Sequence, residues 1–382
     1  MKKLDLDIEQ FWKDDALAHL DNCFSAEAPQ VALGIGMSHE CVFDELGVEG
    51  HPWDAIDPVR QAELNKRYND KAEKIVGRRL LPEKYDWAEV RFPEIKRIGE
   101  VFGSRYEYIN HSEWLLRCCH GPEDVEKMLD RVDKMDIRSF MLPENWEKET
   151  KRIYEETGRR PSPLRGVRGP VTLACSLIGE EDLIFLILDE PDLAKRFSDT
   201  IKRVIIEMGD IMDAEAGITP EESGKQGFSF MDDNCCLLNP EMYELFGYPV
   251  LRDVFAHFAP NEQDKRYQHS DSAMGHLLPI LGKLGLNGVN FGPTVLIPEI
   301  RKHLPKARID GCLAPFTFMR NESDEIVRQV MRDCEDARNY GRGVNIATAG
   351  SINNGSSLES MRLVMAVIQN YGRYKKRNGR VV

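Results

Sequence analysis

The sequence of 382 residues lacks any apolar run close to the roughly 18 residues that a membrane-spanning helix needs. Its most apolar segment, "DLIFLILDEP", is much shorter. The N-terminal "MKKLDLDIEQFWKDD" carries basic residues but lacks the apolar stretch of a signal peptide. We therefore expect a cytoplasmic protein that makes no contact with a membrane.

Basic residues are also scarce, because 51 Lys and Arg stand against 64 Asp and Glu, for a formal net charge of −13. Such a surface repels phosphate groups, so no nucleic acid is expected as a partner. We interpret the basic end "YKKRNGRVV" as a solvated tail. The nine cysteines include no CxxC pair, which argues against a structural zinc knuckle and favours free thiols.

The chain does contain ample material for a core, with 42% hydrophobic and 30% charged residues. Beyond about residue 160, strand-like and helix-like segments alternate repeatedly, as in parallel sheets with right-handed crossovers. The absence of GxGxxG and P-loop motifs weakens the case for a nucleotide-binding doubly wound sheet. The sequence thus predicts an α/β fold, a (β/α)8 TIM barrel with an N-terminal helical extension.

Residues 1–382 are expected to form a single barrel domain. Residues 1–85 would supply the helical extension and the first strand, and residues 86–375 the main barrel. The spacing of apolar residues predicts helices at 8–24, 57–76, 121–135, 144–157, 181–190 and 191–217, irregular strands or a hairpin within 91–116, and a strand at 163–177.

Polar residues follow several predicted strands, and the carboxyl ends of barrel strands all face one mouth. His269 and Asp271 stand two apart at such an end and could hold a metal ion. Alternatively, Asp271 or Ser272 caps the next helix while His269 makes a buried hydrogen bond.

A catalytic zinc usually takes three ligands from the protein. Asp232, Asp233, Glu40 and Cys312 are candidates for the third ligand, and Asp233 is favoured because its strand end should face the same mouth. Asp232 is expected to act in catalysis, either by completing the site or by orienting substrate. The alternative for both aspartates is a turn motif.

Three further residues are predicted to bind substrate, namely Glu40, Asn290 and Cys312. Glu40 has an alternative role as a favourable carboxylate at a helix N-terminus. Asn290 could instead satisfy a backbone group at the end of its strand.

Several stretches resemble the uroporphyrinogen decarboxylase superfamily, in the right order and over about residues 85–374. They are "RGPVTLACSLIGEEDLIFLILDEPDLAKRF", "MDDNCCLLNPEMYELFGYPVLRDVF", "QHSDSAMGHLLPILGKLGLNGVNF", "ARIDGCLAP" and "NIATAGSINNGSSLESMRLVMAVIQNYGRY". This resemblance implies a TIM barrel and one of two chemistries, decarboxylation of porphyrinogens or zinc-dependent methyl transfer to a corrinoid protein.

The residues favour the second chemistry. Arg60-Gln61-Ala62 is similar only to the start of the arginine stretch with which the decarboxylases bind their polyanionic substrate, and the histidine of the final strand is missing. The thiol-activating methyltransferases have His-x-Cys and a later Cys. In this chain His269 matches the histidine, Asp271 stands in place of the first cysteine, and Ser351 or a neighbour in place of the second.

Oxygen ligands in place of thiolates leave zinc a stronger Lewis acid, which suits a donor whose methyl group leaves an oxygen atom. The resemblance therefore implies a small methylated donor, with a methoxylated aromatic favoured and methylamines, betaine and halides left open. A partner protein would carry the corrinoid, because the chain lacks the Asp-x-His-x-x-Gly signature. The alternatives are a lyase like the decarboxylases and a metal-free binding protein. A homodimer is compatible with the sequence.

Overall fold

The computed structural model describes residues 4–54, 56–84, 91–374, 376–377 and 380–381. The chain divides into two compact units. The first comprises Met1–Tyr85, Asp271–Gly275 and Gly288–Val382, and the second comprises Asp86–Ser270 and His276–Asn287. The arrangement as a single domain stays a prediction.

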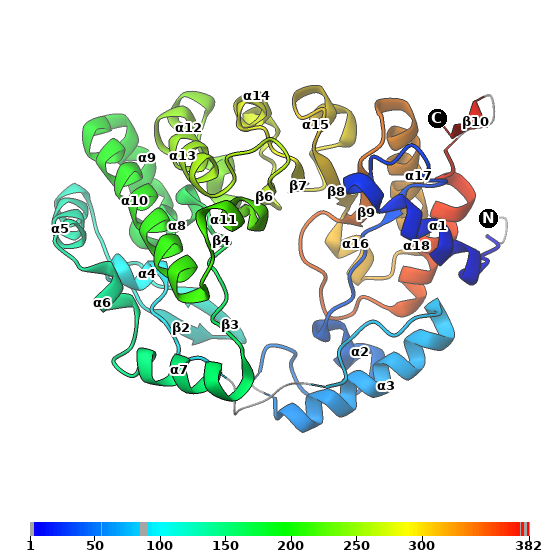
Figure 1. Cartoon of the computed structure of the whole chain (residues 1–382). Coiled ribbons are helices and arrows are strands. Elements are labelled where there is room, and N and C mark those ends of the chain that lie inside the picture. The colour runs from blue at the N-terminus through cyan, green and yellow to red at the C-terminus, as the bar shows by residue number, and fades with distance from the viewer. Residues whose placement is uncertain (1–3, 55, 85–90, 375, 378–379, 382) are drawn as a thin grey trace. The chain divides into compact units, whose positions relative to one another are not determined.

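The first unit contains the strands β1 (Ala32–Leu33), β7 (Gly288–Phe291), β8 (Arg308–Leu313) and β9 (Val344–Thr348). They pair in parallel in the order β1-β9-β8-β7. All four residues of β7 are buried, as expected of a parallel strand covered on both faces. The helices of this unit are α1 (Ile8–Ala18), α2 (Val42–Leu46), α3 (Pro58–Val76), α15 (Ile297–His303), α16 (Pro315–Met319), α17 (Ser323–Tyr340) and α18 (Leu358–Tyr371) (Figure 1).

The second unit contains the parallel strands β4 (Gly166–Arg168), β5 (Phe228–Met231) and β6 (Arg266–Ser270), in the order β4-β5-β6. The strands β2 (Tyr106–Ile109) and β3 (Ser112–Leu115) form an antiparallel hairpin, as predicted. Its helices are α4 (Ile98–Val101), α5 (Pro122–Asp133), α6 (Ile137–Met141), α7 (Trp146–Thr157), α8 (Pro170–Ile178), α9 (Glu180–Asp189), α10 (Pro191–Ala216), α11 (Pro220–Gln226), α12 (Pro240–Phe246), α13 (Tyr248–Phe258) and α14 (Leu278–Leu281) (Figure 1).

Short pieces complete the described chain. These are the 3₁₀-helices η1 (Leu20–Cys23), η2 (His39–Cys41), η3 (Asp233–Leu237), η4 (Gly275–Leu277) and η5 (Gly282–Leu284), and the antiparallel strands β10 (Lys376–Arg377) and β11 (Arg380–Val381). All nine cysteines are free thiols, as predicted. Across the described residues, no helix is both long enough and apolar enough to span a membrane.

The strand predicted for residues 163–177 is wrong in its second half. Strand β4 ends at Arg168, and α8 begins at Pro170. Proline suits the first position of a helix, because its fixed φ is already helical and its missing N–H has no helical partner there. Most of α8 is buried, so its apolar residues show neither the alternation of a strand nor the stripe of a surface helix.

An aromatic cluster fills the core between β5 and α13 in the second unit. Phe228 stacks on Phe258 with ring centroids 5.1 Å apart, and Phe230 meets Phe255 edge to face at 5.4 Å. All four rings are almost completely buried. This packing holds β5 against α13 and so helps to position the carboxyl end of the strand.

The two ends of the first unit lie side by side, where α1 (blue) meets α18 (red) in Figure 1. The backbone N–H of Asp7 donates to Gln369 Oε1 at 2.8 Å, and Gln369 Nε2 donates back to the carbonyl of Asp7 at 2.9 Å. A second tie joins α1 to β1. The buried Asp15 accepts a hydrogen bond from Leu33 N at 2.8 Å, while His19 Nε2 lies 3.2 Å from the carbonyl of Leu33.

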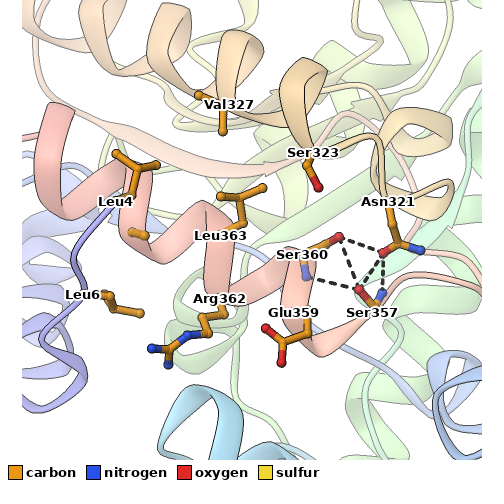
Figure 2. Close-up of a pocket in the computed structure, with 11 residues that line it drawn as sticks. Leu4, Leu6, Asn321, Ser323, Val327, Ser357, Glu359, Ser360, Arg362 and Leu363 are labelled. Carbon is orange, nitrogen blue, oxygen red and sulfur yellow. Dashed lines mark hydrogen bonds between the residues drawn. The ribbon is translucent and has the colours of Figure 1, made fainter. Parts of the chain in front are cut away.

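A pocket of about 520 Å³ lies along α17, α18 and the N-terminal segment (Figure 2). Asn321, at the turn before α17, has a left-handed backbone with φ of 55°. Its Oδ1 accepts hydrogen bonds from the hydroxyl of Ser357 at 2.6 Å and that of Ser360 at 2.7 Å. The asparagine therefore fastens this turn to the start of α18. The strand ends contribute no residue to the pocket lining, so we assign it no part in the chemistry.

The Asp15–His19 pair makes stability depend on pH. The hydrogen bond with Asp15 is the main cause that raises the pKa of His19 to about 10 in the folded protein, from 6.5 in its absence. A group with a raised folded-state pKa stabilises the fold fully below its unfolded pKa and loses that effect as pH rises through the folded value. We therefore expect the contribution of His19 to be complete below about pH 6.5 and to vanish towards pH 10.

Urea unfolding of the wild type and of His19→Gln between pH 6 and pH 10 checks this expectation. The difference between their free energies of unfolding should shrink steadily as pH rises. A difference that stays constant over the whole range would contradict it.

Candidate functional site

The carboxyl ends of β5 and β6 lie beside each other. Met231 pairs with His269 in the parallel register, so the two aspartates after Met231 emerge next to the histidine. His269 Nε2 lies 3.8 Å from Asp233 Oδ1, and their side chains are 21% and 41% exposed. The sequence predicted that these strand ends meet, and the distance agrees with it. The metal-binding roles of both residues stay predictions.

The donor set of this pair fits zinc. Imidazole nitrogen and carboxylate oxygen both bind zinc at about 2.0–2.2 Å, so two ligands of a tetrahedral ion lie roughly 3.3 Å apart. The observed 3.8 Å between His269 and Asp233 is close to that value. Both side chains are partly exposed, so an ion can reach them.

Asp271 follows His269 after a single residue and belongs to the first unit. Its side chain is exposed and faces the loop after β9, where a Cβ on Gly350 would come within 3.1 Å of the Asp271 Cβ. The residue at the N-cap of α14 is Leu277, so capping of α14 is not the role of Asp271. Ser351, the residue in place of a family cysteine, directly follows Gly350 in this loop.

Asp232 is fully buried at the end of β5 and points to the start of α8. Its Oδ1 accepts a hydrogen bond from Thr172 N at 2.8 Å, one of the N–H groups that a helix leaves unpaired at its start. Its Oδ2 has no partner within the described part of the chain. Burial raises the pKa of Asp232 to about 6. This geometry favours a positioning role for Asp232 over the direct contact with substrate expected from the sequence.

Asn290 and Cys312 are engaged in the interior of the first unit. Asn290 Nδ2 donates to the carbonyls of Asp310 and Thr348, and its Oδ1 accepts from Gly350 N at 3.1 Å. The geometry thus favours the alternative in which Asn290 satisfies backbone groups at strand ends. The thiol of Cys312 donates to the carbonyl of Val295, and burial raises its pKa well above the usual value. The roles of both residues as substrate ligands stay predictions.

Glu40 lies within η2, behind the N-cap residue Ser38. Its side chain is half-buried, and burial raises its pKa. A carboxylate in the first turn of a short helix is the alternative that the sequence left open. Its role as a substrate ligand stays a prediction.

A cavity of about 850 Å³ opens within the second unit beside Asp233. The hairpin β2–β3 forms one wall, and the end of β4 with the inner face of α8 forms another. None of the other lining residues was predicted from the sequence. Among them, Arg168, Trp114 and Ser176 offer a cation, an indole ring and a hydroxyl. Arg168 could have been recognised as a residue at a strand end if β4 had been predicted to stop there.

Close packing of Gly169 on Asp232 generates a prediction. A Cβ on Gly169 would lie 2.2 Å from the Cβ of Asp232, whereas a Cβ on Gly166 would find its nearest neighbour at 3.8 Å. We expect Gly169→Ala to lower the free energy of unfolding by about 1–3 kcal/mol, the usual cost of overpacking. The control Gly166→Ala should change it by less than about 0.5 kcal/mol.

Chemical denaturation of both variants measures these differences. If the two alanine variants were equally stable, the close approach between α8 and the end of β5 would be refuted.

Comparisons with known proteins agree with this architecture. The sequence model of the family "Uroporphyrinogen decarboxylase (URO-D)" matches residues 91–371. No curated protein matches the chain. Among solved structures, the chain is similar to a methyltransferase from Methanosarcina mazei, with a TM-score of 0.51 and 17% identity over 81% of this chain and 86% of that chain. At this identity the likeness shows the fold alone.

The parallel strands with covering helices, the family match and the structural likeness all confirm the predicted class, an α/β fold of the TIM-barrel type. The resemblance inferred from the sequence motifs is confirmed as well. Because the matched residues make up well over half of the 382-residue chain, the protein belongs to the uroporphyrinogen decarboxylase family.

Proposed function

We propose that the protein is a zinc-dependent methyltransferase, which moves a methyl group from a small methylated donor to the cobalt of a corrinoid on a partner protein. A methoxylated aromatic is the favoured donor. The observation that carries the proposal is the His269–Asp233 pair at adjacent strand ends, beside a cavity large enough for a small substrate. The fold likeness to a protein named as a methyltransferase supports it.

His269, Asp233 and Asp271 would hold the zinc ion, and these residues form a group that could bind a metal. When bound, zinc acts as a Lewis acid that stabilises negative charge on the atom from which the methyl group leaves. Three protein ligands are the usual number for a catalytic zinc site, which leaves one position open.

The chain's own residues position this machinery. Asp232 holds the start of α8, and the hydroxyl of Thr172 accepts a hydrogen bond from Asn234 N at 2.9 Å. The first turn of α8 is therefore tied to η3, the segment that presents Asp233. The cavity walls would shield the reacting groups from water, which strengthens electrostatic interactions.

Decarboxylation of a porphyrinogen is the second candidate, favoured by the family to which the chain belongs. The positions of Arg60 and Gln61 argue against a role for them in binding the polyanionic substrate of that chemistry. Arg60 and Gln61 lie in the first turn of α3, where Asp57 caps the backbone of Arg60. Gln61 is buried and donates to Asn65 at 2.8 Å, so its side chain serves the packing of the helix.

Zinc binding is the first test of the proposal. We expect the full chain to bind zinc and His269→Ala to bind it more than roughly 100-fold more weakly, because loss of a direct ligand costs at least as much as loss of its supporting contacts. His257→Ala is the matched control, since His257 is a partly exposed histidine that pairs with Asp210 on α10. Metal titration followed by elemental analysis measures both. Equal zinc affinity in wild type and His269→Ala would refute the assigned ligand.

Turnover is the second test. The zinc-loaded chain, mixed with a reduced corrinoid protein and a methoxylated aromatic, should release the demethylated phenol, which mass spectrometry detects. A chelator should abolish the reaction. Release of carbon dioxide from uroporphyrinogen, to give a product with fewer carboxyl groups and without any demethylation, would establish the second candidate instead.

A further inference from the structure

The cavity in the second unit contains an arginine that shares no direct ion pair with the acidic residues of the lining. Its charge acts on Glu113 only as a secondary influence, because the pKa of Glu113 is lowered chiefly by the hydrogen bond with Arg97 and less by the charge of Arg168. Arg168 stands at the end of β4, and its Nη1 donates to the hydroxyl of Ser176 at 2.8 Å. Across residues 91–374 and the other described segments, Arg168 takes part in no ion pair. A guanidinium carries five N–H donors, so most of its donors remain available to a ligand.

The other charged groups near the hairpin are used within the protein. Arg117 pairs with Asp182 and also donates to the carbonyl of Cys119 at 2.9 Å. Glu113 forms a two-pronged ion pair with Arg97. Of the two arginines that line the cavity, Arg168 is therefore the one available to bind an anionic ligand.

An apolar surface faces the same cavity. Trp114 on β3 lines it and remains 57% exposed, which is unusual for a large indole unless a ligand or partner covers it. Ile109, Leu115 and Cys175 extend the apolar lining. A cavity lined by both an indole and a guanidinium with no ion pair among the described residues is suited to a flat apolar body that carries a carboxylate.

Besides Glu113, which is paired with Arg97, two more acidic groups line the cavity. Asp233 is a proposed zinc ligand, and Glu180 accepts a hydrogen bond from Asn234 at 3.5 Å. Both repel an anion, so a carboxylate entering this cavity is directed to Arg168. The uncharged part of such a ligand is then left to lie along the wall that Trp114 forms.

We propose that this cavity binds a small carboxylate with a flat apolar body. Arg168 binds the carboxylate in a two-pronged contact, Ser176 holds the guanidinium in place, and Trp114 packs against the body. That this ligand is also the methyl donor rests on the proposed function, but its binding does not. Arg168 would then select anionic donors over neutral ones.

Calorimetric titration of the full chain with 4-methoxybenzoate and with its neutral analogue 4-methoxybenzamide tests the proposal. The wild type should bind the carboxylate at least tenfold more tightly than the amide. Arg168→Gln should weaken carboxylate binding at least tenfold and leave amide binding nearly unchanged. Arg168→Lys should bind the carboxylate with an affinity between those of the wild type and Arg168→Gln, because lysine keeps the charge but lacks the planar guanidinium.

Two controls separate this effect from general changes in charge and packing. Arg105→Gln removes the same charge from the neighbouring hairpin, where Arg105 pairs with Glu107 and does not line the cavity, so it should bind like the wild type. Trp114→Ala should weaken both ligands by similar factors, whereas Trp114→Phe should retain most of the affinity. Thermal unfolding of each variant confirms that it folds.

The proposal is overturned if the wild type shows no preference for the carboxylate over the amide. It is equally overturned if Arg168→Gln, once shown to be folded, binds the carboxylate like the wild type. The wild-type comparison needs no variant, so it stands even if Arg168→Gln fails to fold. Because the titration uses neither zinc nor a corrinoid, failure of methyl transfer leaves its outcome intact.

Discussion

The candidate site depends on one buried interaction, the hydrogen bond between the carboxylate of Asp232 and the first turn of α8. A buried carboxylate is costly unless donors compensate for its lost hydration. The start of a helix offers such donors, because its N–H groups lack partners and its dipole is positive there. Gly169 makes this contact possible, since any side chain at that position would collide with Asp232.

Several features follow from this contact. It joins the end of β5 to α8, and Thr172 extends the link to η3, so the backbone on both sides of Asp233 is held. The helix fixed in this way also carries Ser176, the partner of Arg168. Within the second unit, the proposed metal ligand Asp233 and the proposed anion-binding arginine thus share one support, which favours precise placement of a substrate.

Membership in the family does not by itself decide the chemistry, because one fold supports many reactions through the residues at its strand ends. In this chain Arg60 and Gln61, which resemble only the start of the arginine stretch of the decarboxylases, lie in the first turn of α3, where Gln61 is buried and donates to Asn65. By resemblance, Asp271 stands in place of the first cysteine of the thiol-activating enzymes, and Ser351 or a neighbour stands in place of the second. Oxygen donors with one imidazole suit a leaving group on oxygen better than a thiol substrate.

Local patterns in the sequence predicted much of the secondary structure. Asp57 and Pro58 predicted the start of α3, because an aspartate caps the helix and a proline suits its first position. Pro191 marked the division between α9 and α10 for the same reason. The pattern failed for α8, whose residues are buried on most sides, so that no polar face reveals the helical period.

The candidate site was predicted only in part. That Asp233 lies near His269 followed from the rule that parallel strands end at one edge. From the sequence, Asn290 was an equally good candidate for contact with substrate. In the structure its amide donates hydrogen bonds to the carbonyls of Asp310 and Thr348. Such a difference depends on which backbone groups meet it across strands far apart in the chain, and no local pattern contains that information.

The sequence by itself determined the class of fold, the order of its elements and the pairing of an imidazole with carboxylates, because helix starts, apolar spacing and ligand types are local properties. Only the tertiary structure decided that Asp232 accepts a hydrogen bond from α8, and that Arg168 lines the same cavity as Trp114 without an ion pair to any residue that the structure describes. Burial and ion pairing depend on residues brought together from distant parts of the chain, and those distances exist only after folding.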